Sequence, residues 1–364
     1  MRRLLLALLL LAISAQLCAC GQLEDYLSVK PHVEPSISDP EPTEAELPPV
    51  VTNSSELRGT VLSFIRSWVE RGTITVADYE GDLSADLAET MHYATKDDPI
   101  GAYAVDYADA ELLTDTDGGR SIEISIVFRR SAAEIDSIVT VSGNTGARDK
   151  IRQALTNFDT ALTLRIRNYE ETDFTADMRR YCLENPATVL ALPEVSADVY
   201  PQEGETRVLE LHFTYPHTRD EMRAMLASVN TILNSAAAYI RGGETARERA
   251  ALLFRFLTVR IDYTVAEGMP AMPAYSLLKE RQAHSSAFAS VFYAECTRAE
   301  IDCAVVEGTL NGQTRYWNSL KLDGQTYYVD LMRSIELDET ELTLLTQEEM
   351  AWAGYVWTDM PEPL

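Results

Sequence analysis

The sequence predicts an α+β protein in which two tandem small α+β modules precede a third α+β domain. Segments with apolar residues at helical spacing alternate with segments in which every second residue is apolar, the pattern of a half-buried strand. Matching residues also recur 87 positions apart in two consecutive stretches. The folded part has about 300 residues, which is too many for a single hydrophobic core, so several domains are expected.

The first twenty residues have the pattern of an export signal. Two arginines precede an uncharged apolar run at 4–15. This run is shorter than the roughly 20 apolar residues that cross a bilayer, and it is typical of a signal peptide. The next residues, Leu17-Cys18-Ala19-Cys20, resemble the lipobox of bacterial lipoproteins.

The lipobox resemblance implies that residues 1–19 are removed and that Cys20 is lipidated. It also implies that the protein is held by its lipid on the outer face of the bacterial cytoplasmic membrane. An ordinary signal peptide cleaved near Ala19 is the alternative.

The chain is strongly acidic, with 57 Asp and Glu residues against 31 Lys and Arg residues and a net charge of -26. Such a surface repels phosphate backbones, which argues against nucleic acid as a partner. It also repels anionic lipid, so we expect membrane attachment through acyl chains, two of which suffice for stable anchoring. The sequence predicts neither a cofactor nor a metal.

Residues 20–55 are expected to form a disordered tether. The segment is rich in proline and acidic residues and has no hydrophobic period, so it cannot bury enough apolar surface to offset the entropy cost of ordering. Its prolines favour an extended spacer between the anchor and the folded part.

The two predicted modules, 56–143 and 144–243, share residues at matching positions. The pairs 87 apart are Pro99 and Pro186, Arg120 and Arg207, Phe128 and Tyr215, and Glu134 and Glu221. Tyr79 and Tyr169 are 90 apart, which one three-residue insertion reconciles. Each module is expected to run helix, strand, helix and two strands around a glycine turn, and the second ends in a long helix from Thr218 to about Arg241. The alternative is that the two segments are unrelated and have turn residues at similar positions by chance.

The stretch Asp115-Thr-Asp117-Gly118-Gly119 has two interpretations. It looks like part of a calcium-binding loop, but Leu113 stands where a ligand is required and no glutamate closes the loop. A hairpin turn fits better, because Asp-Gly supplies the positive φ that such turns need.

The third domain, 244–364, contains an apolar helix that starts Ser285-Ser286-Ala287-Phe288-Ala289. A strand motif, Arg315-Tyr316-Trp317-Asn318, and a hairpin that ends at Asp330 follow it. Over about 120 residues these motifs resemble the transglutaminase-like domains of the papain-type superfamily. In that family the two motifs read Cys-x-Gly-Tyr/Phe-Ala and His-Ala-Trp-Asn, and an aspartate follows the hairpin.

The resemblance places the family's nucleophilic cysteine at Ser285, its histidine at Arg315 and its aspartate at Asp330. A serine hydroxyl needs a general base within hydrogen-bond reach, and an arginine stays protonated and cannot be that base. We therefore expect a degenerate site with no catalytic residues, in which Arg315 and Asp330 form an ion pair. Such a pair fixes geometry but is weak evidence for stability.

Other residues offer no clear replacement for the missing base and nucleophile. His284 is next to Ser285, and adjacent side chains on a helix do not face each other. His212 and His217 belong to the second module and could reach Ser285 only through domain packing. Cys296 lies 11 residues farther along the same helix, or about 16 Å along its axis.

Cys182, Cys296 and Cys303 remain outside the signal and the lipidation site. A bridge between Cys296 and Cys303 is one interpretation, and a pair of small core residues is the favoured one.

Three functions are consistent with these observations. The first is a non-enzymatic surface lipoprotein whose old cleft binds a peptide, a protein or a cell-wall fragment through Arg315 and the exposed rings of Tyr316 and Trp317. The second is a transglutaminase-like or protease-like enzyme with a rebuilt site centred on Ser285. The third is a structural module whose cleft has closed, with Tyr316 and Trp317 buried.

Overall fold

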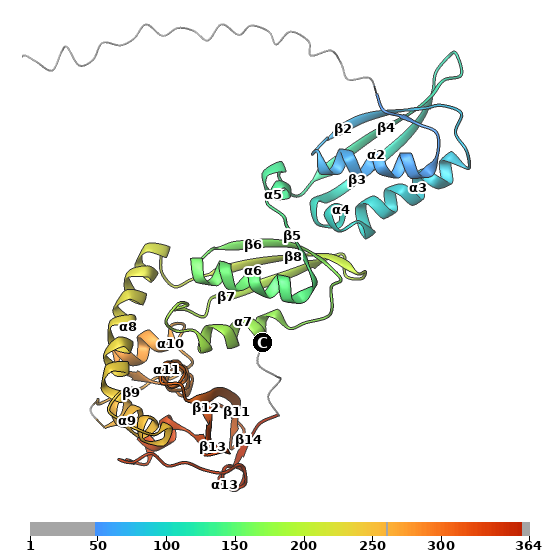
Figure 1. Cartoon of the computed structure of the whole chain (residues 1–364). Coiled ribbons are helices and arrows are strands. Elements are labelled where there is room, and N and C mark those ends of the chain that lie inside the picture. Colours follow the sequence, from blue (N-terminus) through green and yellow to red (C-terminus); the bar gives the residue numbers. More distant parts are fainter. Residues whose placement is uncertain (1–47, 260, 359–364) are drawn as a thin grey trace, which may run out of the picture. The chain divides into compact units, whose positions relative to one another are not determined.

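The structure is a computed structural model that describes residues 48–259 and 261–358. The predicted signal peptide, the lipidation site Cys20 and most of the predicted tether lie outside the described residues. The fold is mixed α+β, as the sequence predicts, and the described part contains three four-stranded sheets and one two-stranded sheet (Figure 1).

The first module is a four-stranded sheet covered by helices on one face. The strands, in the order β1-β2-β4-β3, are β1 (Val50–Val51), β2 (Arg71–Val76), β4 (Arg120–Phe128) and β3 (Val105–Thr114). Strand β1 is parallel to β2, and the other neighbours are antiparallel. The covering elements are α2 (Ser54–Arg66), α3 (Leu83–His92), the π-helical turn η2 (Tyr93–Asp97) and α4 (Pro99–Ala104) (Figure 1). Along β4 the buried residues alternate with exposed or half-exposed ones, as expected for a sheet with one solvated face.

The second module has the same strand topology. Its strands, in the order β5-β6-β8-β7, are β5 (Val139–Ser142), β6 (Ala161–Arg167), β8 (Thr206–Thr214) and β7 (Glu194–Tyr200). Again the first pair is parallel and the others are antiparallel. The helices are α6 (Gly143–Asn157) and α7 (Phe174–Glu184), and the short helix α5 (Ala132–Asp136) precedes β5. The predicted order of elements is present in both modules, whereas a common origin of the two sequences stays a prediction.

The module boundaries differ from those predicted. Strand β1 lies in the segment predicted as tether up to residue 55, and β5 lies before the predicted boundary at 144. Strand β1 has two residues, too few for a period of two, and β5 has only four, the shortest run in which that period can be recognised. Each is defined by its pairing with a parallel partner, β2 or β6, so the modules begin at about residues 50 and 139.

The turn between β3 and β4 is a hairpin turn, the favoured interpretation of its sequence. Gly118 has a φ of 81°. Asp115 Oδ1 accepts hydrogen bonds from the backbone nitrogens of Asp117 at 2.8 Å and Gly119 at 2.9 Å, so its carboxylate is used within the turn. Across the described residues, no group of three or more His, Cys, Asp and Glu side chains could hold a metal ion.

The third domain follows the predicted long helix, which is α8 (Arg219–Ile240), with a capping box between Thr218 and Glu221. Its four-stranded antiparallel sheet, in the order β13-β12-β11-β14, contains β13 (Gln325–Val329), β12 (Gln313–Leu322), β11 (Asp302–Leu310) and β14 (Tyr355–Val356). The helices are α9 (Ala246–Thr258), α10 (Pro273–Tyr275), α11 (Ser285–Arg298), α12 (Leu331–Glu336) and α13 (Gln347–Trp352). The π-helical turn η3 (Ser276–Glu280) and the parallel strands β9 (Thr264–Val265) and β10 (Gln282–Ala283) complete it.

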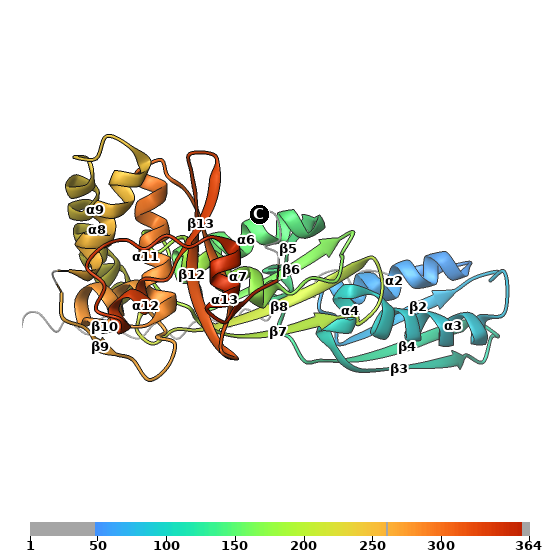
Figure 2. The ribbon, with the colours of Figure 1, turned by 90° about the horizontal axis from the view of Figure 1, so that it is seen from below.

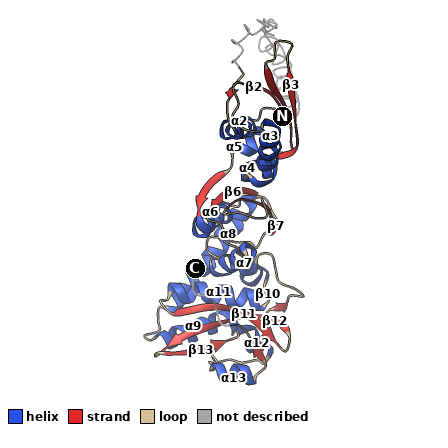
Figure 3. Cartoon of the chain, turned by 90° about the vertical axis from the view of Figure 1, so that its right-hand side faces the viewer, coloured by secondary structure: helices blue, strands red, loops and turns tan. Residues whose placement is uncertain are grey.

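Helix α11 lies at the centre of this domain. It is buried along most of its length, as expected for a helix with small or apolar residues on every face. Its side chains share a core with α8 and α9, including Phe254, Phe288 and Phe292. Figure 3 shows the sheet between α11 on one side and α13 on the other. In the described ranges, no helix is both long enough and apolar enough to cross a membrane.

Candidate functional site

Ser285 lies at the N-terminus of α11, where the sequence places the degenerate nucleophile position. The Ser285 Oγ atom accepts a hydrogen bond from the backbone nitrogen of Tyr316 at 3.3 Å. The residue is only 4% exposed. Its hydroxyl therefore contacts the backbone of β12 and has almost no access to solvent.

Arg315 on β12 forms the expected ion pair with Asp330. Arg315 Nε donates to Asp330 Oδ2 at 2.7 Å, and Nη1 donates to Glu336 Oε1 at 2.9 Å. The two side chains of the main pair are 14% and 3% exposed. Burial lowers the pKa of Arg315, but the attraction of Asp330 and Glu336 outweighs it and raises the pKa above its usual value. Arg315 therefore keeps its charge and cannot accept a proton.

The Asp330 carboxylate is fully occupied by donors. Besides Arg315, the Tyr355 hydroxyl donates to Oδ2 at 2.8 Å, and the backbone nitrogen of Arg333 donates to Oδ1 at 3.0 Å. The bond from Arg333 caps the N-terminus of α12. Burial, reinforced by the charge of Asp330, raises the pKa of Tyr355, so that residue stays a neutral donor. The Asp330 carboxylate therefore accepts hydrogen bonds from Arg315, from Tyr355 and from the first turn of α12, and not from a histidine.

A single hairpin brings Arg315 and Asp330 together. In the antiparallel pairing of β12 with β13, Asn318 lies opposite Val329. Asp330 is therefore the first residue past the paired part of the hairpin, and Arg315 lies just beyond Asn318 on the partner strand. The ion pair that the resemblance implied therefore forms across one hairpin.

His284 is the histidine that the structure brings to this site, but its partner is Ser286 and not Ser285. It is the N-cap of α11 and has an extended backbone with φ of -145°. Among the described residues, no hydrogen bond joins His284 to Ser285, as the sequence predicts. Its Nδ1 lies 2.7 Å from Ser286 Oγ and accepts from the Ser286 backbone nitrogen at 3.2 Å. Burial lowers the pKa of His284, and the charge of Arg315 lowers it further. The imidazole is therefore held neutral beside Ser286.

The contact between His284 and Ser286 is that of a base and a hydroxyl, but Ser286 is 0% exposed. No substrate can reach that oxygen in this structure, and the contact serves to close the first turn of α11. His212 Nε2 lies 3.3 Å from Glu210 in the second module. Within the described part of the chain, neither His212 nor His217 makes a hydrogen bond or ion pair with Ser285.

Tyr316 and Trp317 are buried, at 3% and 1% exposure, so the expectation of exposed binding residues at these positions is wrong. Neighbouring residues of a strand point to opposite faces of its sheet. Tyr316 packs with Ala289 of α11, whereas the Trp317 ring lies 5.1 Å from that of Tyr355 and 5.5 Å from that of Trp357. Strand β12 is an inner strand covered on both faces (Figure 3), so neither ring is available to a ligand.

The three described cysteines are free thiols. Cys296 is 0% exposed and packs in the same core as Cys303, whereas Cys182 belongs to the core of the second module. Burial raises the pKa of Cys182 to about 12, which disfavours the reactive thiolate. These positions agree with the interpretation of the cysteines as small core residues.

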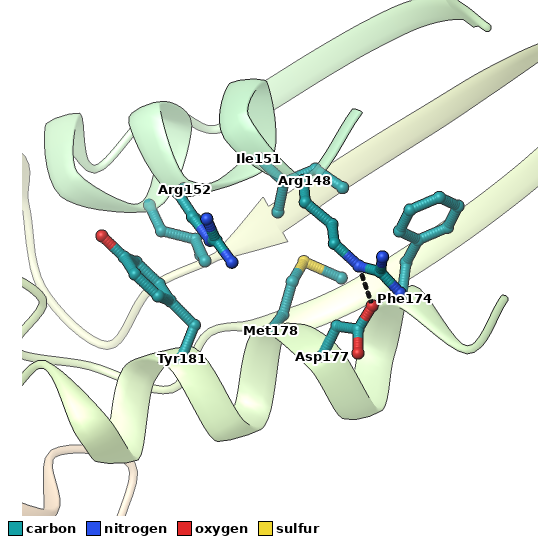
Figure 4. A pocket seen from close by; sticks show the side chains of 8 residues that line it. Arg148, Ile151, Arg152, Phe174, Asp177, Met178 and Tyr181 are labelled. Carbon is teal, nitrogen blue, oxygen red and sulfur yellow. Dashed lines mark hydrogen bonds and ion pairs between the residues drawn. The ribbon is translucent and has the colours of Figure 1, made fainter. Parts of the chain in front are cut away.

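A crevice in the second module is too small to be a binding site. Figure 4 shows it between α6 and α7, where Arg148 Nε pairs with Asp177 Oδ2 at 2.7 Å. The guanidinium carbon of Arg152 lies 5.5 Å from the centre of the Tyr181 ring. The free volume is about 10 Å³, which is about the room that one water molecule needs.

Comparisons with known proteins find only weak structural similarities. No family model matches the chain, and no curated protein matches it. Among solved structures, it is similar to a candidate cysteine protease from Cytophaga hutchinsonii, with 12% identity, a TM-score of 0.26, and coverage of 42% of this chain and 66% of that one.

Two further solved structures are similar. One is a TGase, with 10% identity, a TM-score of 0.26, and coverage of 57% of this chain and 60% of the other. The second is a candidate protease from Parabacteroides distasonis, with 10% identity, a TM-score of 0.21, and coverage of 71% and 39%. The chain therefore spans less than two thirds of each of these three proteins. Identities and TM-scores this low carry no argument about activity.

Proposed function

We propose that this protein is an exported lipoprotein, anchored through Cys20, whose transglutaminase-like domain has lost catalysis and acts as a non-catalytic binding module. The proposed ligands are a peptide, a protein or a cell-wall fragment. The observation that carries the proposal is the buried ion pair of Arg315 and Asp330 at the positions where the family has its histidine and aspartate.

Acyl transfer needs a nucleophile, a base that takes its proton, and space for the substrate. Arg315 supplies no base, and Ser285 Oγ already accepts a hydrogen bond from β12. Tyr316 and Trp317 are buried, so the old cleft does not offer the aromatic groove that the sequence suggested. A ligand of this module would therefore bind at another surface. The burial of Tyr316 and Trp317 is what the structural module with a closed cleft predicts, and that module is a further candidate function.

The rebuilt-site enzyme is the second candidate, and the contact of His284 with Ser286 is the observation in its favour. The distance of 2.7 Å suits proton transfer from a hydroxyl to an imidazole. Catalysis would then require α11 to expose Ser286, which is fully buried.

We expect no covalent adduct on Ser285 or Ser286 when the purified chain is incubated with activated esters and with a fluorophosphonate probe. Intact-mass and peptide mass spectrometry would measure this, with Ser285→Ala and Ser286→Ala as matched controls. An adduct on wild-type Ser285 or Ser286 that disappears in His284→Ala would overturn the proposal in favour of the enzyme.

The anchor is tested separately in cells. Metabolic labelling with a radiolabelled fatty acid should mark the wild-type protein and leave Cys20→Ala unlabelled and no longer held on the membrane by lipid. Cys18→Ala is the matched control, because it changes a cysteine of the same signal and should keep the label. If Cys20→Ala remains labelled, the anchor is assigned to the wrong residue.

A further inference from the structure

A pocket of about 280 Å³ lies at the junction of α8, α9 and α11 and is lined by three arginines, Arg241, Arg249 and Arg298. Figure 2 shows these three helices side by side. Basic residues are far outnumbered by acidic ones in this chain. Three guanidinium groups around one pocket therefore reverse the prevailing charge locally.

Two of the three arginines are held in place by the protein itself. Arg249 Nε donates to the carbonyl oxygen of Ala299 at 3.1 Å, and its Nη1 donates to the carbonyl oxygen of Glu244 at 3.2 Å. Arg298 Nη1 donates to Asn234 Oδ1 at 3.3 Å and to Glu295 Oε1 at 3.2 Å. A guanidinium has five N–H donors in a rigid plane, so each of these arginines keeps donors that its protein partners do not use.

Arg241 differs from the other two. It is the C-cap of α8 and is exposed, and no hydrogen bond or ion pair joins its side chain to the residues that the structure describes. A structural role through side-chain contacts therefore does not explain its place at the pocket.

The charges near the pocket leave a positive surplus. Helices α8 and α11 both end here, and each helix C-terminus carries the equivalent of about half a negative charge. The carboxyl of Glu295, which pairs with Arg298, adds at most one more negative charge. Three arginines exceed this total by about one positive charge. Two more carboxylates, Glu244 and Glu300, lie close in the chain to residues of the pocket, but both are exposed and solvent and salt screen their charge.

We propose that this arginine pocket binds a phosphate group, which deepens the proposed binding function and rests on it. Planar guanidinium groups match the oxygens of phosphate in pairs, and a phosphate offers more oxygens and more charge to three arginines than a carboxylate does. Since a water molecule occupies about 30 Å³ of liquid, the pocket has room for the phosphate and part of the molecule that carries it. A phosphorylated soluble molecule, a phosphodiester polymer or a phospholipid headgroup all present this chemistry.

The test is calorimetric titration of the purified full chain with inorganic phosphate and with glycerol 3-phosphate, in chloride buffer at low and high salt. We expect saturable binding that weakens as salt rises, with Arg241→Ala at least about tenfold weaker and Arg241→Glu without binding. Arg223→Ala is the matched control, because Arg223 lies on the same helix and its side chain is 57% exposed. It should bind phosphate like the wild type.

The source of the phosphate is tested with vesicles and the unlipidated chain Cys20→Ala. Binding to phosphatidylglycerol vesicles but not phosphatidylcholine vesicles, lost in Cys20→Ala/Arg241→Glu, identifies a lipid headgroup. Binding to glycerol 3-phosphate without vesicle binding identifies a soluble or polymeric phosphate. Three outcomes would overturn the proposal. They are no phosphate binding in any of these experiments, an affinity of Arg241→Glu for phosphate equal to that of the wild type, and an affinity of the wild type for acetate equal to that for phosphate. None of these readouts depends on a reaction at Ser285 or Ser286, so the two proposals fail separately.

Discussion

Arg315→Ala is expected to lower the free energy of unfolding by about 3–5 kcal/mol, the range for breaking a buried ion pair by removing one partner. The variant leaves Asp330 buried at 3% side-chain exposure without its charged donor, and it removes one of the two arginine partners of Glu336. Arg315→Lys keeps the charge but cannot donate to Asp330 and Glu336 as the planar guanidinium does, so an intermediate loss is expected. Urea denaturation followed by circular dichroism measures both.

Arg247→Ala is the control for this experiment. Its ion pair with Asp323 spans 3.5 Å between side chains that are 47% and 80% exposed, and exposed pairs contribute about 0–1 kcal/mol. A loss in Arg315→Ala no larger than that in Arg247→Ala would show that the pair does not hold the old active site together.

Glu295→Gln is expected to stabilise the protein at pH 8 and to have little effect at pH 4.5. Glu295 is fully buried, its Oε2 has no hydrogen-bond partner within the described ranges, and burial raises its pKa from 4.5 to about 7. The folded state therefore holds the proton more tightly than the unfolded state. The stability from this proton is fully present below pH 4.5 and is lost as the pH rises through about 7.

The size of this effect follows from the shift in pKa. At 1.36 kcal/mol per unit, the penalty on wild-type stability at pH 8 is on the order of 3 kcal/mol, and the glutamine variant lacks it. The measurement is the free energy of unfolding in urea at both pH values. Glu300→Gln, at an exposed position nearby in the chain, should stay within about 0.5 kcal/mol of the wild type. A gain in Glu295→Gln of equal size at both pH values would contradict the explanation.

Much of the architecture could be predicted because its signals are local. The hairpin at Gly118 depends on turn residues, and α8 depends on the cap at Thr218 and on apolar spacing. The ion pair of Arg315 with Asp330 was expected from the resemblance to the transglutaminase-like motifs, and in the structure both residues belong to one hairpin region. Interactions within a helix or a hairpin involve few other parts of the chain, so the sequence pattern is enough.

The missed features depend on segments that are distant in the sequence. Strand β1 has two residues and is defined by pairing with β2. His284 reaches Ser286 because it is the extended N-cap of α11 and not a residue of the helix. Neither feature leaves a periodic signal in the sequence.

The sequence by itself determined which chemical groups occupy the proposed degenerate site: Ser285, Arg315 and Asp330, with no base among them. Only the tertiary structure decided what those groups can reach. Trp317 is inaccessible because Tyr355 and Trp357, far along the chain, pack against its ring. Arg241, Arg249 and Arg298 form one pocket because three helices meet there. The identity of a residue sets the charge of its side chain. Its burial and its neighbours depend on packing between segments that are distant in the sequence, and local sequence patterns carry no information about that packing.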